Sequence, residues 1–331
     1  MPAAAEALVE ITRGDILESV HHGHWAVVRS SGEIVDCAGD PETVAFPRSS
    51  AKMIQALPLL ESGAGRDLTA EHLALACASH AGERRHIERV ARWLSDLGLD
   101  EHALCCGPQA SRDPELHDEM IRTGEAVTRI FNNCSGKHTG FLTVAKHLHA
   151  DLYYVDPENP VQRAVRDAFE DVTGAPSPGY GIDGCSAPNF ATTVHGLAWA
   201  MARFAAARSD GDARERAAVM LREAIMTHPE LVSGRNRPTA LLNRAAAGKA
   251  AVKSGAEGVY VAILPEQELG VAVKVADGAS RASEVTIAAL LTRLGVVDPA
   301  DPAVAGFLDR PVTNYMGQIV GAERPVIGLT G

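Results

Sequence analysis

The chain has 331 residues, 46% of them hydrophobic, and a net charge of -11 from 31 basic and 42 acidic residues. This length and composition are enough for a large core, and they predict roughly two domains of about 150 residues or one large domain with an insertion. The acidic balance repels phosphate groups and argues against nucleic acid and anionic membranes as partners.

The start of the chain and its cysteines predict a soluble, cytoplasmic protein. Residues 1–24 lack a basic region followed by an uninterrupted apolar run, so we expect no signal peptide. No stretch approaches about 18 consecutive apolar residues, so no transmembrane helix is expected. Six cysteines without a secretion signal indicate reduced thiols.

The first predicted elements are a β-hairpin followed by helices. Strands over 25–29 and 33–37 flank a Ser-Ser-Gly turn. Ranges 49–63, 69–80 and 82–98 have helical periodicity. Pro58 should kink the first helix, and a capping box beginning at Thr69 should start the second. In the third we expect these residues to face inward: Ile87, Val90, Ala91 and Leu94.

More helices are predicted over 135–149, 158–174, 189–208, 212–229 and 283–295, the last of which should close the chain. The inward face of the helix over 135–149 should be Phe141, Leu142, Ala145 and Leu148. A second hairpin is predicted over 258–278. Strands do not alternate regularly with helices, which argues against a doubly wound parallel sheet. We therefore predict an α+β fold, with an antiparallel sheet from both chain ends covered by helices. It should form one catalytic unit over 1–331, with a possible inserted helical subdomain over about 65–240.

The first chemical motif is Arg48-Ser49-Ser50-Ala51-Lys52. On a helix, Ser49 and Lys52 would share one face, about one turn apart. A serine hydroxyl needs a nearby base to act as a nucleophile, and a lysine serves when burial lowers its pKa. Taken singly, the motif is better explained by a serine N-cap followed by a solvated lysine, because Ser-x-x-Lys is a common sequence.

The second motif is Lys253-Ser254-Gly255, just before the strand predicted from Gly258. A Lys-Ser/Thr-Gly run on a strand beside a Ser-x-x-Lys helix is typical of penicillin-binding and β-lactamase-type enzymes. There the lysine supplies positive charge, and the glycine lets substrate approach the strand. The joint occurrence of both motifs, in this chain order, favours an enzyme over two unrelated turns.

Three further segments carry polar side chains at helix ends or turns. Residues 77–83 place a serine, an imidazole and a carboxylate after an apolar helix. Residues 132–138 place Cys134, Lys137 and His138 on one helical face. Residues 181–188 form a glycine-rich turn that exposes Asp183 and Cys185. By spacing alone, the two cysteines fit buried small hydrophobes better than metal ligands.

Together these segments resemble the rhizobial-type L-asparaginases, the asparaginase II family. Five runs fit in order over about 20–278: FPRSSAK, CASHAGE, CCGPQ, NNCSGKHTGF and GIDGCSAPNFA. The resemblance implies a fold related to serine β-lactamases and glutaminases. It also implies a homodimer.

The resemblance further implies two Ser-Lys tandems, with Ser49 and Lys52 as the first and Ser79 and Lys137 as the second. It implies a Zn²⁺ ion held by Cys134, Cys185 and Lys137. Asp183 would bind the substrate amine or orient the zinc-bound water. The remaining candidates for the substrate site are Arg48, His80 and His138. For Arg48, contact with the substrate carboxylate and support of the helix are equally good interpretations.

We therefore expect a hydrolase that converts L-asparagine to L-aspartate and ammonia. In this hypothesis Lys52 takes the proton of Ser49, Ser49 attacks the side-chain amide, and Ser79 relays a proton to the leaving ammonia. The alternatives are a glutaminase or other small-amide hydrolase, and a zinc-hydroxide hydrolase in which Ser49 is a bystander. A binding module of the same fold is disfavoured because Ser49 and Lys52 are both intact.

Overall fold

The computed structural model describes residues 4–326, and the chain divides into two compact units. The first unit comprises the chain up to Ser50, the segment Thr192–Ala206 and everything from Leu241 onward. The second comprises Ala51–Ala191 and Ala207–Ala240. The chain crosses from the first unit to the second between Ser50 and Ala51, inside the first chemical motif.

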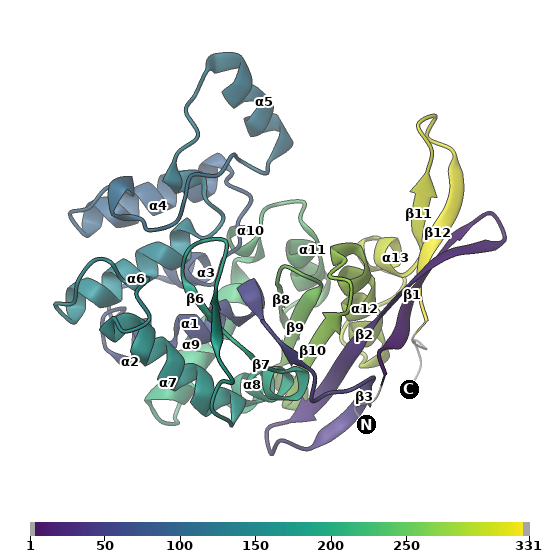
Figure 1. The fold of residues 1–331 in the computed structure, drawn as a ribbon, viewed down its shortest axis with the longest axis horizontal. Helices are drawn as coiled ribbons and strands as arrows, with labels where there is room; N and C mark the ends of the chain where they lie inside the picture. The colour runs from purple at the N-terminus through teal and green to yellow at the C-terminus, as the bar shows by residue number, and fades with distance from the viewer. Residues whose placement is uncertain (1–3, 327–331) are drawn as a thin grey trace. The chain divides into compact units, whose positions relative to one another are not determined.

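The first unit is built on an eight-stranded antiparallel sheet in the order β11-β12-β1-β2-β10-β9-β8, with β3 paired to β2 (Figure 1). Strands from both ends of the chain lie side by side in it, because β2 pairs with β10 in a register that joins Trp25 to Val273. Its strands are β1 (Glu6–Arg13), β2 (Ile16–Arg29), β3 (Ile34–Ala38), β8 (Ala251–Ser254), β9 (Val259–Leu264), β10 (Leu269–Val275), β11 (Arg310–Thr313) and β12 (Ile319–Pro325).

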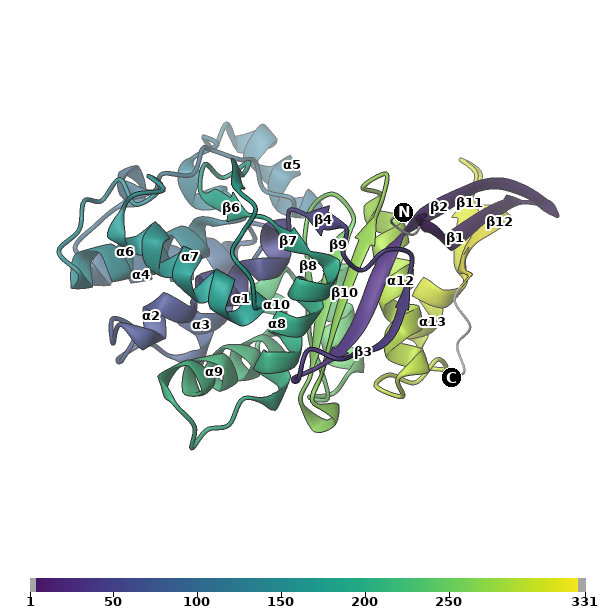
Figure 2. The same ribbon diagram turned by 60° about the horizontal axis from the view of Figure 1, so that its bottom comes forward.

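Helices cover both faces of this sheet, as Figure 2 shows for α8 (Val194–Ala206) and α12 (Ser280–Arg293). Alternate residues of each strand point to opposite faces. Trp25, Val271 and Val273 belong to the buried cluster that packs with α12. On the other face α8 lies against the backbone of β10, where a Cβ at Gly270 would come within 2.0 Å of the Ala198 carbonyl oxygen. The close approach therefore requires glycine at this position. The unit also holds α13 (Pro302–Leu308) and the short pair β4 (Val44–Ala45) with β7 (Thr192–Thr193).

The second unit is mainly helical. A two-stranded hairpin of β5 (Tyr180–Ile182) and β6 (Pro188–Phe190) is its sheet component among residues 4–326. Helix α6 is buried along most of its length, from Ser135 to Ala145. The helices are α1 (Lys52–Gln55), α2 (Leu57–Glu61), α3 (Ala70–Ala76), α4 (Arg84–Asp96), α5 (Pro114–Thr123), α6 (Ser135–His147), α7 (Pro160–Thr173), α9 (Ala213–Thr227) and α10 (Pro229–Val232). Helix α11 (Pro238–Ala245) runs across the boundary between the units along the chain.

The predicted α+β fold with an antiparallel sheet from both chain ends is confirmed. Both predicted hairpins are present, as β2–β3 and β9–β10. The helix predicted over 49–63 is instead a 3-10 turn, Arg48–Ala51, followed by α1 and α2, with Pro58 in the first turn of α2. The predicted helix is interrupted there because proline lacks the N–H that a continuous helix would use.

Several details of the predicted helices were wrong. In α4 the buried face carries His86 and Trp93, whereas Ala91 is exposed. Leu148 lies beyond the end of α6 and is 40% exposed. The range 189–208 begins with short strands rather than helix. The chain continues beyond α12 with α13, β11 and β12, so α12 does not close it.

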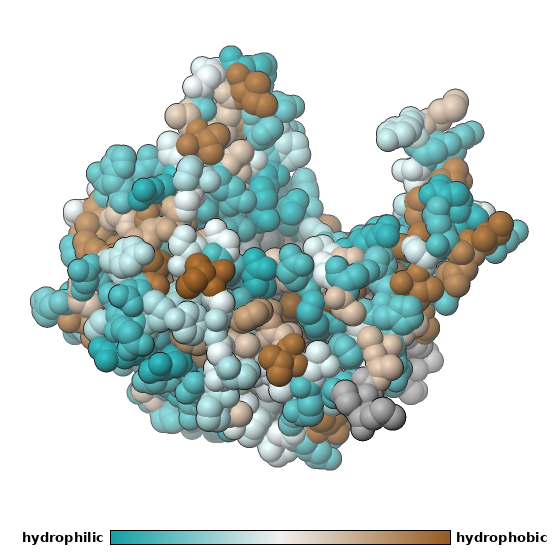
Figure 3. Space-filling view, in the orientation of Figure 1, coloured by the Kyte–Doolittle hydropathy of each residue, from teal (hydrophilic) through white to brown (hydrophobic). Residues whose placement is uncertain are grey.

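The face of the molecule seen in Figure 3 is mostly hydrophilic, in keeping with the excess of acidic residues. Exposed apolar side chains occur at the β1–β2 and β11–β12 turns, where Ile16 is 75% exposed and Met316 is 83% exposed. Within residues 4–326, no helix is both long and apolar enough to span a bilayer.

Candidate active site

Lys52 begins α1 and its side chain is only 1% exposed. Its ammonium nitrogen donates to the Ala78 carbonyl oxygen at 2.5 Å, to Ser79 Oγ at 3.0 Å and to Cys134 Sγ at 3.1 Å. An ammonium has three donors, so these three acceptors satisfy it. Lys52 therefore joins the second candidate serine to the first candidate metal ligand, all within the second unit.

Ser79 follows the end of α3, in a segment that backbone hydrogen bonds to other parts of the chain hold in place. The Ser79 N–H donates to the Val232 carbonyl oxygen at 2.8 Å, and the His80 N–H donates to the Asn133 carbonyl oxygen at 3.1 Å. The backbone thus fixes Ser79 so that its half-buried side chain meets Lys52.

Ser49 is half-buried and lies in the 3-10 turn Arg48–Ala51, which leads directly into α1. Arg48, which starts the turn, has a φ of 54°, a left-handed conformation that costs free energy for a residue with a Cβ. The next serine has a structural role, because Ser50 is fully buried and its hydroxyl donates to the Pro47 carbonyl oxygen at 2.7 Å. Local geometry therefore distinguishes the two adjacent serines.

The Lys253-Ser254-Gly255 run lies beside this turn within the first unit. A Cβ at Gly255 would come within 2.5 Å of the Pro47 carbonyl oxygen, so only glycine permits this approach. Lys253 is on β8 itself rather than before the strand, is fully buried, and donates from Nζ to the Ser254 carbonyl oxygen at 2.8 Å. The structure thus brings the Lys-Ser-Gly strand against the turn that carries Ser49.

Cys134 is the residue immediately before α6, and Asn132 shapes that helix start. Asn132 Oδ1 accepts from the Cys134 N–H at 2.9 Å, and Cys134 Sγ lies 3.1 Å from Asn133 Oδ1. Cys134, one turn before Lys137 and His138, thus shares the buried start of α6 with them.

Cys185 lies in the turn between β5 and β6, opposite Lys137. Lys137 Nζ lies 3.1 Å from Cys185 Sγ. The Asp183 carbonyl oxygen accepts from the Ser186 N–H at 2.8 Å, and Ser186 has a φ of 70°. This tight turn keeps the half-buried Asp183 near Lys137, where its charge helps to raise the pKa of the lysine.

The two thiols and Lys137 form one electrostatic group. The hydrogen bond between the thiols holds the pKa of Cys185 well below its ordinary value, and the Lys137 charge lowers it further. The same hydrogen bond raises the pKa of Cys134, and burial adds to the effect. Burial alone would lower the pKa of Lys137, but the two sulfurs outweigh it and raise this pKa. Of the two sulfurs, Cys185 is therefore the one on which the surroundings favour a negative charge.

His138 lies against this group and is fully buried. Its Nδ1 is 2.8 Å from the Tyr154 hydroxyl, which accepts from the Cys105 N–H at 2.7 Å. The hydroxyl can therefore donate to Nδ1. Burial lowers the pKa of His138. Its buried Nε2 has no hydrogen-bond partner by distance and angle among residues 4–326, although the imidazole is close enough to help lower the pKa of Cys185.

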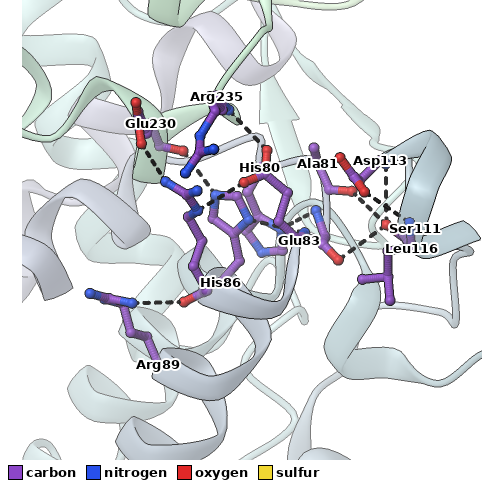
Figure 4. Close-up of polar contacts among 12 residues, drawn as sticks. His80, Ala81, Glu83, His86, Arg89, Ser111, Asp113, Leu116, Glu230 and Arg235 are labelled. Atoms are coloured by element: carbon purple, nitrogen blue, oxygen red, sulfur yellow. Dashed lines mark hydrogen bonds and ion pairs between the residues drawn. The ribbon is translucent and has the colours of Figure 1, made fainter. Parts of the chain in front are cut away.

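His80 is also fully buried, and its ring is stacked on His86 with centroids 4.8 Å apart (Figure 4). His80 Nδ1 accepts from the Gly82 N–H at 3.1 Å, so Nε2 carries the proton that goes to Ser135 Oγ at 2.9 Å. Burial holds the pKa of His80 well below its usual range and lowers that of His86 to about 4. Both rings are therefore neutral near pH 7, and their contacts favour a positioning role for His80.

Of the predicted residues, the second unit brings together Lys52, Ser79, Cys134, Lys137, His138, Asp183 and Cys185. The resemblance paired Ser79 with Lys137, but the hydrogen bond to Ser79 Oγ comes from Lys52, while Lys137 contacts Cys185. Sequence reasoning missed Tyr154, because a buried tyrosine in a loop has no spacing signal that links it to His138.

A metal ion would need the two thiols and Lys137, since within residues 4–326 no three His, Cys, Asp or Glu side chains are grouped to hold one. Two sulfurs and an amine nitrogen are acceptable zinc donors once the lysine has lost its proton. The lowered pKa of Cys185 is compatible with a cation in this position.

Comparison with known proteins identifies one family. The family model described as L-asparaginase II matches residues 9–325, nearly the whole chain. No curated protein matches the sequence significantly.

The solved structures that match the chain share little sequence with it. A β-lactamase from Mycobacterium bovis is 13% identical, with a TM-score of 0.40, over 79% of this chain and 89% of that one. The protein Mglu in its glutamate form is 14% identical, with a TM-score of 0.46, over 83% of this chain and 61% of that one. A β-lactamase/D-alanine carboxypeptidase from Pseudomonas syringae is 12% identical, with a TM-score of 0.44, over 80% of this chain and 92% of that one.

Proposed function

Because the chain belongs to the L-asparaginase II family, we propose that it hydrolyses the side-chain amide of L-asparagine to L-aspartate and ammonia through a serine nucleophile. The family supports an amidohydrolase. The observation that carries the serine mechanism is the buried amino group of Lys52, which lies 3.0 Å from Ser79 Oγ and three residues after Ser49.

Ser49 is the proposed nucleophile. It lies one helical turn before Lys52 along a continuous 3-10 and α-helical segment, in which residues three apart face the same side. Ser50 is already committed to the Pro47 carbonyl oxygen. In its neutral amine form, Lys52 takes the hydroxyl proton as Ser49 attacks the amide carbon. The amide C–N bond then breaks, and water later releases aspartate from the acyl-enzyme.

Ser79 is the proposed proton relay. A hydroxyl both donates and accepts, so Ser79 can accept a proton from Lys52 and pass its own to the leaving ammonia. This step needs a short, fixed contact between the two groups. The 3.0 Å hydrogen bond and the anchored backbone of Ser79 supply that contact.

We further propose that Cys134, Cys185 and Lys137 hold Zn²⁺ in a positioning role. When bound, the ion would supply positive charge that orients the substrate. Cys185 and Cys134 would provide the two sulfurs, and Lys137 the amine. Lys52 would stay with the catalytic serines, because Ala78 and Ser79 already accept two of its protons.

Purified protein should therefore contain zinc, and Cys185→Ser should lose it, because a hydroxyl is a much poorer zinc ligand than a thiolate. Metal analysis of protein prepared without chelators checks this. Cys106→Ser is a matched control, since Cys106 is also buried but is not in the proposed ligand set. Equal metal content in wild type and Cys185→Ser would remove the site from the proposal.

A second candidate is metal-assisted hydrolysis in which Ser49 is not needed. It is supported by the buried imidazole of His138, which lies close enough to Cys185 to lower the pKa of that thiol and would join the two cysteines at the metal. Loss of turnover on chelation, recovered by added zinc, would support this candidate if Ser49→Ala stayed active. We prefer the serine mechanism because Lys52 lies beside Ser79 and one turn after Ser49. Under this mechanism, chelation should weaken substrate binding more than it slows the chemical step.

Asp183 is the proposed partner of the substrate amine. It is half-buried in the tight β5–β6 turn, where the Gly184 N–H donates to its Oδ1 at 2.7 Å. A clamped amine fixes how far the side-chain amide reaches, and about 1 Å of misplacement can cost about a hundredfold in rate. The longer side chain of glutamine should therefore react poorly.

We expect the specificity constant for asparagine to exceed that for glutamine by at least about a hundredfold. An ammonia-release assay on asparagine, glutamine and a β-lactam measures it. Asp183→Ala should weaken asparagine binding while the zinc content stays unchanged. Values for the two amides within about tenfold of each other would replace asparaginase by a glutaminase-like activity.

A homodimer and a cytoplasmic location complete the proposal. Both come from the resemblance and the sequence, and exposed apolar residues such as Ile16 and Met316 are compatible with an interface. Light scattering on the purified protein tests the dimer, and fractionation of the producing cells tests the location.

A further inference from the structure

A cavity of about 660 Å³ in the second unit has an unusual share of arginines in its wall. We call it the arginine cavity; its arginines are Arg84, Arg85, Arg112, Arg235 and Arg237. The whole chain is acidic, with a net charge of -11, so a concentration of positive charge is unexpected on general grounds. Its volume is within the usual range for small-molecule sites, about 300–1,000 Å³.

Two of these arginines are neutralised by carboxylates. Arg84 forms a bidentate pair with Glu125, at 2.8 and 2.6 Å. Arg85 pairs with Glu83 at 2.9 Å and also contacts Glu230. Their charges are therefore balanced within the protein, and they serve mainly to build the wall.

Arg112 and Arg237 are different. Arg112 Nη2 donates to the carbonyl oxygens of Ser79 and His80, at 3.0 and 3.2 Å. These are neutral acceptors, and among residues 4–326 neither arginine has an ion pair with a carboxylate. Burial lowers the pKa of Arg112, and the charge of Arg237 lowers it further. The positive charges of the two guanidinium groups therefore oppose each other in the cavity wall.

The helix N-termini at the cavity are not available to bind an anion. Helices α4 and α5 both start there, but each start is already satisfied by a neighbouring side chain. Asp113 accepts from the Leu116 N–H at 2.9 Å, and His86 Nδ1 accepts from the Glu83 N–H at 3.1 Å. What remains is an excess of positive charge in the wall, where five arginines stand against Glu83, Asp113 and Glu115.

The loop that carries Arg237 is held against the opposite wall. Gly234 has a φ of 128°, and a Cβ there would lie 2.7 Å from Glu83 Oε1. The Arg235 N–H donates to the same carboxylate oxygen at 2.9 Å, and Figure 4 shows Arg235 and Glu83 facing each other. The Arg237 N–H closes the turn onto the Gly234 carbonyl oxygen. The cavity is therefore formed by defined contacts.

We propose that the arginine cavity binds a small molecule with a dianionic oxyanion group, a phosphate or a dicarboxylate, between Arg112 and Arg237. A guanidinium presents paired N–H donors that match the oxygens of both groups. One dianion would balance both charges and remove their repulsion. This site goes beyond the proposed function and does not depend on it, because neither Ser49 nor the two cysteines line the cavity.

Arg112 connects the arginine cavity to the segment that carries Ser79. Its Nη2 group holds the Ser79 and His80 carbonyl oxygens, and the Arg112 N–H donates to the Ala81 carbonyl oxygen at 2.7 Å. An anion that fixes the guanidinium therefore also fixes the segment that carries Ser79. Bound anion should raise the thermal midpoint of the full-length protein, because it stabilises the folded state by mass action.

Calorimetric titration of the full-length protein with inorganic phosphate and with succinate, at constant ionic strength, tests the proposal. Saturable binding of at least one probe is expected, and the two arms distinguish the phosphate from the dicarboxylate. Arg237→Gln should weaken that binding by about tenfold or more, the usual worth of a charged hydrogen bond. Arg112→Gln should do the same and is an independent second variant.

The matched control is Arg163→Gln, which removes the same charge from an exposed position on α7 away from the cavity. It should leave binding within about twofold of wild type, since distant surface charges are screened. Circular dichroism verifies that each variant is folded. Absence of saturable binding for both probes, or equal weakening in Arg237→Gln and Arg163→Gln, would overturn the proposal whether or not the protein hydrolyses asparagine.

Discussion

Ser49→Ala should lower turnover of asparagine by at least about a thousandfold, because groups that act as one catalytic unit fail together when one is removed. Ser49 is half-buried, and its replacement deletes a single hydroxyl. The free energy of unfolding should change by about 1 kcal/mol or less. Steady-state ammonia release and thermal unfolding measure the two effects.

The neighbouring serine is the matched control for this prediction. Ser50 is fully buried and donates to the Pro47 carbonyl oxygen at 2.7 Å. Ser50→Ala leaves that oxygen without this donor and should lower stability by about 1 kcal/mol, with turnover changed far less than in Ser49→Ala. The serine mechanism is wrong if Ser49→Ala retains more than about a tenth of wild-type turnover.

Lys52→Ala should also lose at least about a thousandfold in turnover, since it removes the base and its hydrogen bond to Ser79 together. It leaves a small cavity where the buried side chain was. Added primary amines should enter this cavity and restore part of the rate, more so for more basic amines.

Lys146→Ala is the control for the amine experiment, because Lys146 is an exposed lysine near the end of α6. It should keep wild-type turnover and show no response to amines. If Lys52→Ala is as inactive as expected but no amine restores any rate, Lys52 acts as a fixed charge and not as a base.

The local signals that predicted the fold were those with a direct physical cause. Alternating β-branched residues on both sides of Pro265 predicted the β9–β10 hairpin, and Gly174 marked the end of α7. The strands β1, β11 and β12 were missed although β1 forms a hairpin with β2 and β11 with β12. Much of β11 and β12 is exposed, which weakens the apolar alternation that marks a strand. At Thr69 the cap was predicted with an acid, but His72 Nδ1 accepts the Thr69 N–H instead.

For the candidate site, too, the sequence predicted local features and left the long-range contacts open. Short-range spacing indicated Ser49 with Lys52, and Cys134 with Lys137. Which of these groups touch was not readable, because it depends on how α1, α6 and the β5–β6 turn pack. The contact of Lys52 with Cys134 joins residues 82 positions apart. Arg112 carried no motif, and its role at the Ser79 backbone emerged only from packing.

The most direct test of the account is mass spectrometry of enzyme that is quenched with acid during turnover of asparagine. Trypsin cleaves after Arg48 and Lys52, so Ser49 and Ser79 fall in different peptides. We predict an aspartyl ester on the peptide that begins at Ser49, and its absence in Ser49→Ala. An ester on the peptide that contains Ser79, or full turnover without any covalent adduct, would contradict the assignment of Ser49 as the nucleophile.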